Sequence, residues 1–160
     1  MLTINLICVG SLKEKYYAEA QREFLKRLGS YCKLTVEEVP ETRLPDSPSK
    51  AEIEAALLRE AAFITERCAK NGARIAMCVE GDMADSTAFA GFLRDYAVSG
   101  VSRIDFLVGG SFGLDSGIKR KADRRLSMSK MTFPHNLARI MLLEQIYRGF
   151  KILEGGKYHK

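Results

Sequence analysis

The 160-residue sequence lacks the features that would place it in a membrane or on a secretory route. It contains no apolar run near the roughly 20 residues that a membrane-spanning helix needs. Residues 1–9 have no basic leader and run directly into Gly10 and a charged segment, so they predict a buried strand and not a signal peptide. We therefore expect a cytoplasmic protein that does not associate with membranes.

Paired cysteines and metal-ligand spacings are missing as well. The four cysteines are Cys8, Cys32, Cys68 and Cys78, and they form no CxxC pair. No histidine stands near them at the spacing of a metal site. Three of them lie in segments of regular apolar period, where a thiol behaves as a small hydrophobic side chain. We expect core cysteines, with neither a disulfide framework nor a bound metal.

Several motifs of nucleotide and hydrolase chemistry are also absent. The glycine-rich stretch 109–113 has neither the GxGxxG of a dinucleotide-binding loop nor the Gly-Lys-Ser/Thr of a phosphate-binding loop. No obvious aspartate cluster for Mg²⁺ and no Ser-His-Asp set is found. These absences argue against a nucleotide-using transferase or hydrolase.

Positive charge is concentrated near the C-terminus. Residues 117–160 hold 11 Lys and Arg against 3 Asp and Glu, a net charge of +8, whereas the first 116 residues carry −3. A basic end on a neutral or acidic body is typical of nucleic-acid binding, since its cations displace counterions from phosphates. A solvated basic face explains the same charge, so charge alone leaves both interpretations open.

Apolar periodicity predicts strands that alternate with helices. Strands are expected at 3–9, 34–39 (an edge strand), 74–79, 104–108 and 125–128, and helices at 13–28, 49–72 with a cap at Ser49, 86–100 with a cap at Ser86, 118–122 and 136–153, with a turn at Gly81-Asp82. This alternation predicts an α/β fold with a mostly parallel sheet covered on both faces, in one domain spanning 1–160. Ligands of such sheets bind at the carboxyl ends of strands, here 80–81, 109–110 and 128–133.

Two segments at these strand ends suit a ligand pocket. Gly109 and Gly110 follow a buried strand and remove side chains where a ligand or another backbone approaches, although a tight turn that needs positive φ also explains them. Segment 127–135 mixes hydroxyls, a lysine and a histidine with large apolar side chains, so its main chain could grip a heterocycle that those side chains enclose. A structural loop packed under the sheet is the alternative.

The last helix and the tail carry further candidate groups. The helix is apolar on more than one side, so it is either central to the fold or shared with a second subunit. Glu144 and Arg148 stand four residues apart, and a helix-surface ion pair explains them most simply. The basic tail contains Tyr158 and His159, which can stack on bases or contact phosphate, although a frayed terminus would have the same composition.

Together these segments resemble the bacterial ribosomal large-subunit pseudouridine N3-methyltransferases, the RlmH family of the SPOUT superfamily. The resemblance covers nearly the whole chain. It is carried by 9–13, 108–111 with Gly113, 126–135, 143–148 and 158–160. Phe112 departs from the small polar residue that the family often has there. A terminal lysine in place of arginine keeps the charge but loses bidentate phosphate geometry.

The resemblance implies a SPOUT-type fold with a C-terminal trefoil knot, a homodimer, and S-adenosylmethionine bound in the knot. The implied cofactor contacts are Met77, Gly109, Gly110, Met128, Ser129, Lys130, Met131, Thr132 and Phe133. The catalytic candidates are His135, Arg148, Tyr158 and His159. The expected RNA contacts are Lys130, Arg139, Lys157, Tyr158, His159 and Lys160.

The implied activity is methylation of N3 of a pseudouridine in a stem-loop of large-subunit (23S) ribosomal RNA, within assembled ribosomes. N3 of a uracil-type ring carries a proton at neutral pH, so a base or an anion-stabilising group must assist, and the sequence does not choose among the candidates. Tyr158 and His159 are expected to bind substrate in the partner subunit's pocket. The alternative is a non-enzymatic RNA-binding factor of the ribosome, which would not bind S-adenosylmethionine.

Overall fold

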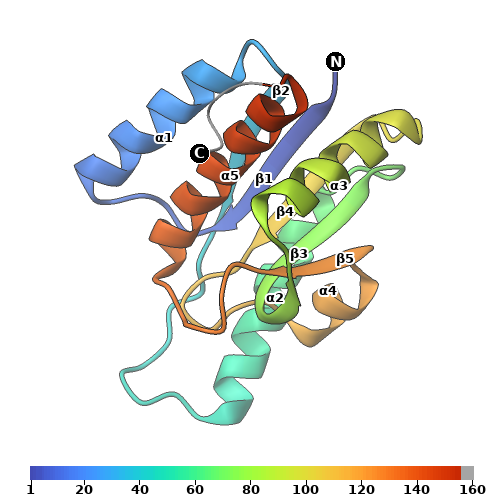
Figure 1. The fold of residues 1–160 in the computed structure, drawn as a ribbon. Coiled ribbons are helices and arrows are strands. Elements are labelled where there is room, and N and C mark those ends of the chain that lie inside the picture. Colours follow the sequence, from blue (N-terminus) through green and yellow to red (C-terminus); the bar gives the residue numbers. More distant parts are fainter. Residues whose placement is uncertain (156–160) are drawn as a thin grey trace.

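The computed structural model describes residues 1–155, which form one sheet with helices on both faces (Figure 1). In chain order the elements are β1 (Thr3–Val9), α1 (Lys15–Leu28), β2 (Lys33–Val39), α2 (Lys50–Arg67), β3 (Ala73–Met83), α3 (Ser86–Val98), β4 (Arg103–Val108), α4 (Ser116–Lys121), β5 (Arg124–Ser127) and α5 (His135–Leu153). The predicted alternation of strands and helices is confirmed. Within the described part of the chain, no helix has the length and apolar character to cross a membrane.

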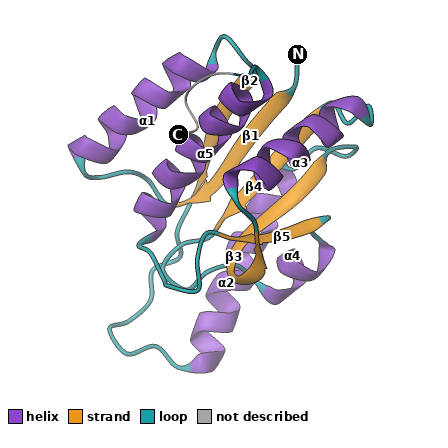
Figure 2. Cartoon of the chain, viewed as in Figure 1, coloured by secondary structure: helices purple, strands orange, loops and turns teal. Residues whose placement is uncertain are grey.

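The sheet has five strands in the order β2-β1-β4-β3-β5, and every neighbouring pair is parallel. The strands form a single layer between helices, orange in Figure 2. β1 and β4 are central and almost wholly buried, as strands covered on both faces must be. β2 is an edge strand, as its alternating polar residues predict. The knot implied by the resemblance is compatible with this order, and its threading stays a prediction.

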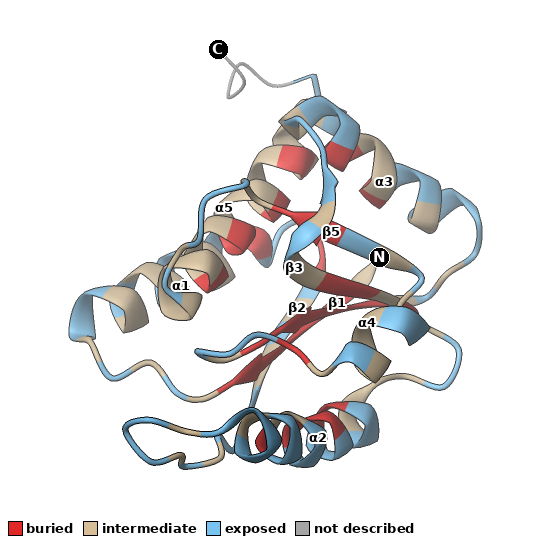
Figure 3. Ribbon diagram, turned by 90° about the horizontal axis from the view of Figure 1, so that it is seen from below, coloured by how far each residue is buried: buried red, intermediate tan, exposed pale blue. Residues whose placement is uncertain are grey.

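Two helical layers cover the sheet. α1, α3 and α5 lie on one face, while α2 and α4 lie on the other (Figure 3). Alternate side chains of β1 divide between the two layers, because successive residues of a strand point to opposite faces. Ile4 and Leu6 belong to the core under α1, α3 and α5, whereas Ile7 and Val9 belong to the core under α2 and α4.

α5 is the central helix of the larger layer and lies between α1 and α3. Its Leu142, Leu143 and Ile146 are fully buried. Gly149 allows α3 to approach closely, because a Cβ there would lie 2.9 Å from Cδ1 of Leu93. Of the two explanations for its apolar sides, the central position in the fold is therefore confirmed. The homodimer stays a prediction.

Local sequence signals set the helix starts. Ser49 accepts the main-chain N–H of Glu52, and Glu52 accepts that of Ser49, so the predicted capping box is confirmed. The predicted cap of α3 at Ser86 is wrong. Asp85 is the cap, and its carboxylate accepts a main-chain N–H of the first turn. Ser86 instead donates its hydroxyl to Gln145 of α5 at 2.7 Å.

The predicted turn at Gly81-Asp82 is wrong, because β3 continues through it to Met83. β3 pairs with β5 on both sides of an irregularity between Met77 and Asp82. Gly81 lies where the two backbones come closest, since a Cβ there would be 2.7 Å from the carbonyl carbon of Leu126. The glycine serves a close approach between strands, and such a glycine resembles a turn residue in the sequence.

Cys8 and Cys32 are core residues, as predicted. Burial raises the pKa of each thiol to about 12, although the nearby Arg139 charge opposes the effect at Cys8. Cys68 and Cys78 are only partly buried, and all four thiols are free. The two core cysteines are therefore protonated and unreactive at physiological pH.

Candidate functional site

A cleft of about 850 Å³, the β4 cleft, opens where β4 and β5 end, beside β3. Its walls are residues 77–80 within β3, the turn 108–114 at the end of β4, and segment 126–135, which begins in β5. Lys119 of α4 and Ala138 of α5 complete the lining. The cleft lies at the carboxyl edge of parallel strands and has the volume of a small-molecule site.

Most of the expected cofactor contacts line the β4 cleft. These residues are Met77, Gly109, Gly110, Met128, Ser129, Met131, Thr132 and Phe133. Lys130, the ninth, is exposed and lies outside the lining. The structure thus brings together three segments that are well separated in the sequence.

Gly109 is required by a close backbone approach, and Gly110 by the close approach of the Glu41 and Val9 side chains. A Cβ on Gly109 would collide with the main chain of Gly113, and Gly110 forms an isolated bridge with Gly113. Among these three glycines only Gly113 has a positive φ, 78°. The explanation of Gly109-Gly110 by positive φ is therefore wrong, and the approach of another backbone is confirmed for Gly109.

The opposite wall of the β4 cleft is segment 127–134, which has few internal hydrogen bonds. The Ser127 hydroxyl donates to the Ser129 carbonyl at 2.8 Å, and Ser129 Oγ accepts the Met131 N–H at 3.0 Å. The N–H groups of Thr132 and Phe133 have no acceptor within residues 1–155. Met131 is 73% exposed, so the alternative of a loop packed under the sheet is wrong. Open main-chain donors and apolar side chains line the same cleft.

The charged pair of the β4 cleft was not foreseen from the sequence, which indicated 80–81 as a strand end but not Lys119. Lys119 of α4 donates to Oε1 of Glu80 at 2.5 Å, and both residues line the cleft. This hydrogen bond lowers the pKa of Glu80 and keeps it ionised. The pair is 39 residues apart and belongs to no motif, so only the placement of α4 beside β3 reveals it.

The catalytic candidates are separated in the structure. His135, the first residue of α5, lines the β4 cleft. Arg148 lies farther along α5, where its guanidinium contacts Glu144 Oε1 at 2.6 Å, and the predicted ion pair is confirmed. Glu144 lines a neighbouring cleft of about 530 Å³. Tyr158 and His159 lie outside the described residues.

Arg139 is buried, with 1% of its surface exposed. Its guanidinium donates to Glu38 Oε1 at 2.9 Å and to the Gly10 carbonyl at 2.9 Å. A guanidinium enclosed in this way does not reach an RNA phosphate, so the prediction of an RNA contact at Arg139 is wrong. Apolar periodicity did not reveal this burial. Because α5 is covered on several sides, its sequence has no distinct polar stripe that would show which side faces solvent.

The other expected RNA contacts remain predictions. Lys130 is exposed on the loop after β5. The remainder, Lys157, Tyr158, His159 and Lys160, lie outside the described residues.

The chain is similar to known proteins along its length. A family model described as "Predicted SPOUT methyltransferase" matches residues 2–159. Ribosomal RNA large subunit methyltransferase H of Clostridium kluyveri is 45% identical over 159 residues, which cover 99% of this chain and 100% of that protein. The protein of the same name from Streptococcus suis is 44% identical with the same coverage.

A solved structure also has a similar fold. The structure of a probable methylase family protein from Haemophilus influenzae Rd KW20 matches with a TM-score of 0.52 and 13% identity, over 99% of this chain and 70% of that one. At this identity the likeness concerns the fold alone. Since the family model spans nearly the whole sequence and the relatives match from end to end, this chain belongs to the SPOUT methyltransferase family.

Proposed function

We propose that this chain is an S-adenosylmethionine-dependent methyltransferase of large-subunit ribosomal RNA. The observation that carries the proposal is that eight of the nine expected cofactor contacts line one cleft. The relatives from Clostridium kluyveri and Streptococcus suis, named as ribosomal RNA large subunit methyltransferases, support the substrate class. We propose residues 1–160 as a single domain of this kind.

The lining of the β4 cleft suits S-adenosylmethionine. Met77, Met128 and Phe133 provide apolar contacts for a heterocycle, while the open N–H of Thr132 can bind its edge. Glu80 and Lys119 pair with each other in this lining and add a polar contact of no net charge. The bound cofactor would supply a methyl group on a sulfonium, so the chemistry needs no covalent nucleophile from the protein.

The protein must hold the acceptor nitrogen in line with that methyl group and exclude water. If the acceptor is N3 of a pseudouridine, its proton must pass to a base, or cations must stabilise the anion. His135 lines the cleft and is the candidate within reach. Arg148 does not line the cleft, so in this proposal it affects the reaction only indirectly, through another residue. Tyr158 and His159 bind RNA in this proposal and reach the cleft of a second subunit.

Calorimetric titration with S-adenosylmethionine tests the cofactor site. We expect saturable binding with one molecule per chain. The non-enzymatic alternative predicts no heat of binding, and that result would refute the cofactor proposal.

Methyl transfer to ribosomes from a strain without the gene tests the activity. We expect labelled methyl groups in large-subunit RNA, which mass spectrometry would map to a single pseudouridine. Ribosomal RNA with the same modification map in the presence and absence of the protein would overturn the activity.

A further inference from the structure

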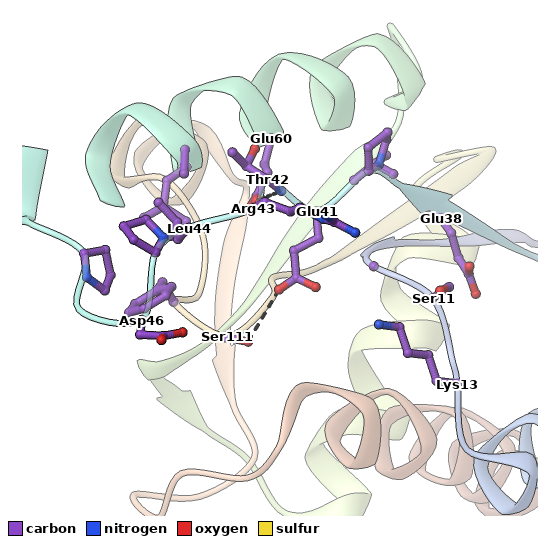
Figure 4. Close-up of a pocket in the computed structure, with 18 residues that line it drawn as sticks. Ser11, Lys13, Glu38, Glu41, Thr42, Arg43, Leu44, Asp46, Glu60 and Ser111 are labelled. Atoms are coloured by element: carbon purple, nitrogen blue, oxygen red, sulfur yellow. Dashed lines mark hydrogen bonds between the residues drawn. The ribbon is translucent and has the colours of Figure 1, made fainter. Parts of the chain in front are cut away.

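A second cleft, of about 710 Å³, lies beside the β4 cleft and has no role in the reaction as described so far. This β2 cleft is walled by the turn after β1, by loop 40–48 after β2 and by one side of α2 (Figure 4). Ser111 and Phe112 line both clefts. A single turn of the chain therefore separates them.

Two cations of the β2 cleft are unpaired. Lys13 stands on the turn after β1 and Arg43 on loop 40–48, and both are exposed. Neither side chain forms an ion pair or hydrogen bond with residues 1–155. Figure 4 shows the Lys13 amine pointing into the space beneath the loop. The lining also holds the carboxylates of Glu38, Glu41, Asp46 and Glu60, of which Glu38 pairs with Arg139 and Glu60 is buried. Unpaired cations on two walls of the cleft can contact individual phosphate groups.

Glu41 places a carboxylate in the same cleft. Its Oε1 accepts the Ser111 hydroxyl at 3.4 Å, and no cation among the described residues pairs with it. The carboxylate occupies room left by two glycines. A Cβ on Gly110 would lie 2.9 Å from Oε1 of Glu41, and a Cβ on Gly10 would lie 3.1 Å from Oε2. The ends of β1 and β4 thus determine where this acceptor lies.

Hydrogen bonds from two buried side chains, Glu60 and Arg139, hold both walls of the β2 cleft. Thr42 donates its main-chain N–H to Oε2 of Glu60 at 3.0 Å, and Glu60 is 5% exposed. On the other wall, Arg139 donates to the Gly10 carbonyl from the interior. These contacts keep Glu41 and its neighbours in place without a ligand, so the cleft is preformed and binding costs less ordering entropy.

We propose that the β2 cleft binds a nucleotide of the RNA substrate next to the methyl acceptor, an inference that rests on the proposed function. Lys13 and Arg43 contact its phosphates, and Glu41 accepts an N–H from the Watson–Crick edge of its base. A carboxylate offers only acceptors, so it binds the N–H donors of that edge and not its acceptors. The shared wall at Ser111 and Phe112 places this nucleotide beside the cofactor.

Lys13→Ala and Arg43→Ala test the phosphate contacts, with Lys15→Ala as the matched control. The Lys15 side chain is 89% exposed, two residues from Lys13 and outside both clefts. The measurement is the affinity for protein-free large-subunit RNA as a function of salt. Each cleft variant should bind RNA about fivefold more weakly and lower the salt slope by about 0.7 to 1. Lys15→Ala should leave the slope unchanged.

Glu41→Gln tests the base contact. The amide introduces donors where the carboxylate has only acceptors. We expect kcat/KM for methyl transfer to fall about tenfold or more, with no change in the salt slope, because no phosphate contact is lost. Affinity for S-adenosylmethionine should stay within twofold in all of these variants, which also shows that they are folded.

Different results would refute the proposed function and the proposed role of the β2 cleft. Wild-type protein that binds no S-adenosylmethionine and transfers no methyl group would refute the proposed function. Wild-type activity, with Lys13→Ala and Arg43→Ala equal to Lys15→Ala in RNA affinity and slope, would refute the β2 cleft alone. Weaker binding to whole ribosomes with unchanged binding to protein-free RNA would assign the cleft to a protein partner and overturn the inference.

Discussion

The two clefts at the carboxyl edge of the sheet differ in what they offer a ligand. The β4 cleft presents methionines, Phe133, open main-chain donors and the Glu80–Lys119 pair, whereas the β2 cleft presents Lys13 and Arg43 together with Glu41 and Asp46. Only the turn at Ser111 and Phe112 separates them. Neighbouring parallel strands end side by side but continue into unrelated loops, so one edge can hold an apolar heterocycle beside a charged polymer.

Replacing Arg139 should have the largest effect, since it supports the β2 cleft from within. Arg139→Met leaves Glu38 and the Gly10 carbonyl without their buried partner and should lower the free energy of unfolding by about 3 kcal/mol in urea titrations. Arg22→Met, at an exposed position of α1, should change it by less than about 0.5 kcal/mol. Equal stability of the two variants would show that the β2 cleft does not depend on Arg139.

Removing residues 158–160 should affect RNA chemistry and leave the β4 cleft intact. If Tyr158 and His159 bind substrate, methyl transfer should fall about 100-fold or more, equivalent to about 2.7 kcal/mol in the barrier. Calorimetry should give an S-adenosylmethionine affinity within twofold of that of the full chain. Normal turnover by the shortened protein would exclude the proposed role of the tail.

Filling the β4 cleft should weaken cofactor binding and leave the phosphate contacts with RNA intact, the reverse of removing the tail. Ala138→Phe places a ring in the cleft and should weaken S-adenosylmethionine binding by about tenfold or more, while the salt slope of RNA binding stays unchanged. Ala88→Phe, exposed on α3 and outside both clefts, is the control. Cofactor affinity that is equal in the two variants would place the cofactor elsewhere. Gly109→Val is less selective, because its side chain would displace the turn that both clefts share.

The smallest expected effect concerns Glu60, the buried anchor of loop 40–48. Burial raises its pKa in the folded protein, so its contribution to stability is complete below the unfolded pKa and is lost as pH rises through the folded value. Glu60→Gln can still accept the Thr42 N–H and has no charge to bury. Its thermal stability relative to wild type should rise from pH 4 to pH 7, by about 1 kcal/mol or less. If the stability difference between Glu60→Gln and wild type stayed constant from pH 4 to pH 7, the idea that ionising the buried Glu60 costs stability would be wrong.

Sequence reasoning succeeded where a residue's role depends on its neighbours along the chain. The capping box at Ser49, the edge character of β2 and the core cysteines all follow from short-range pattern. It failed at Gly81, where a glycine serves contact with β5 and not a turn. It also failed at Arg139, because a helix covered on several sides has no polar stripe to separate an inward charge from an outward one.

By itself the sequence determined the order of strands and helices and, through its resemblance to one family, the apolar segments that line the β4 cleft. These features depend on periods and turn residues that act over a few positions. Only the tertiary structure decided which strand ends are neighbours, and so that Glu41 after β2 meets Gly10 after β1 and Gly110 after β4. The reason is that strand order depends on burying both faces of the sheet at once, through contacts between residues far apart in the chain.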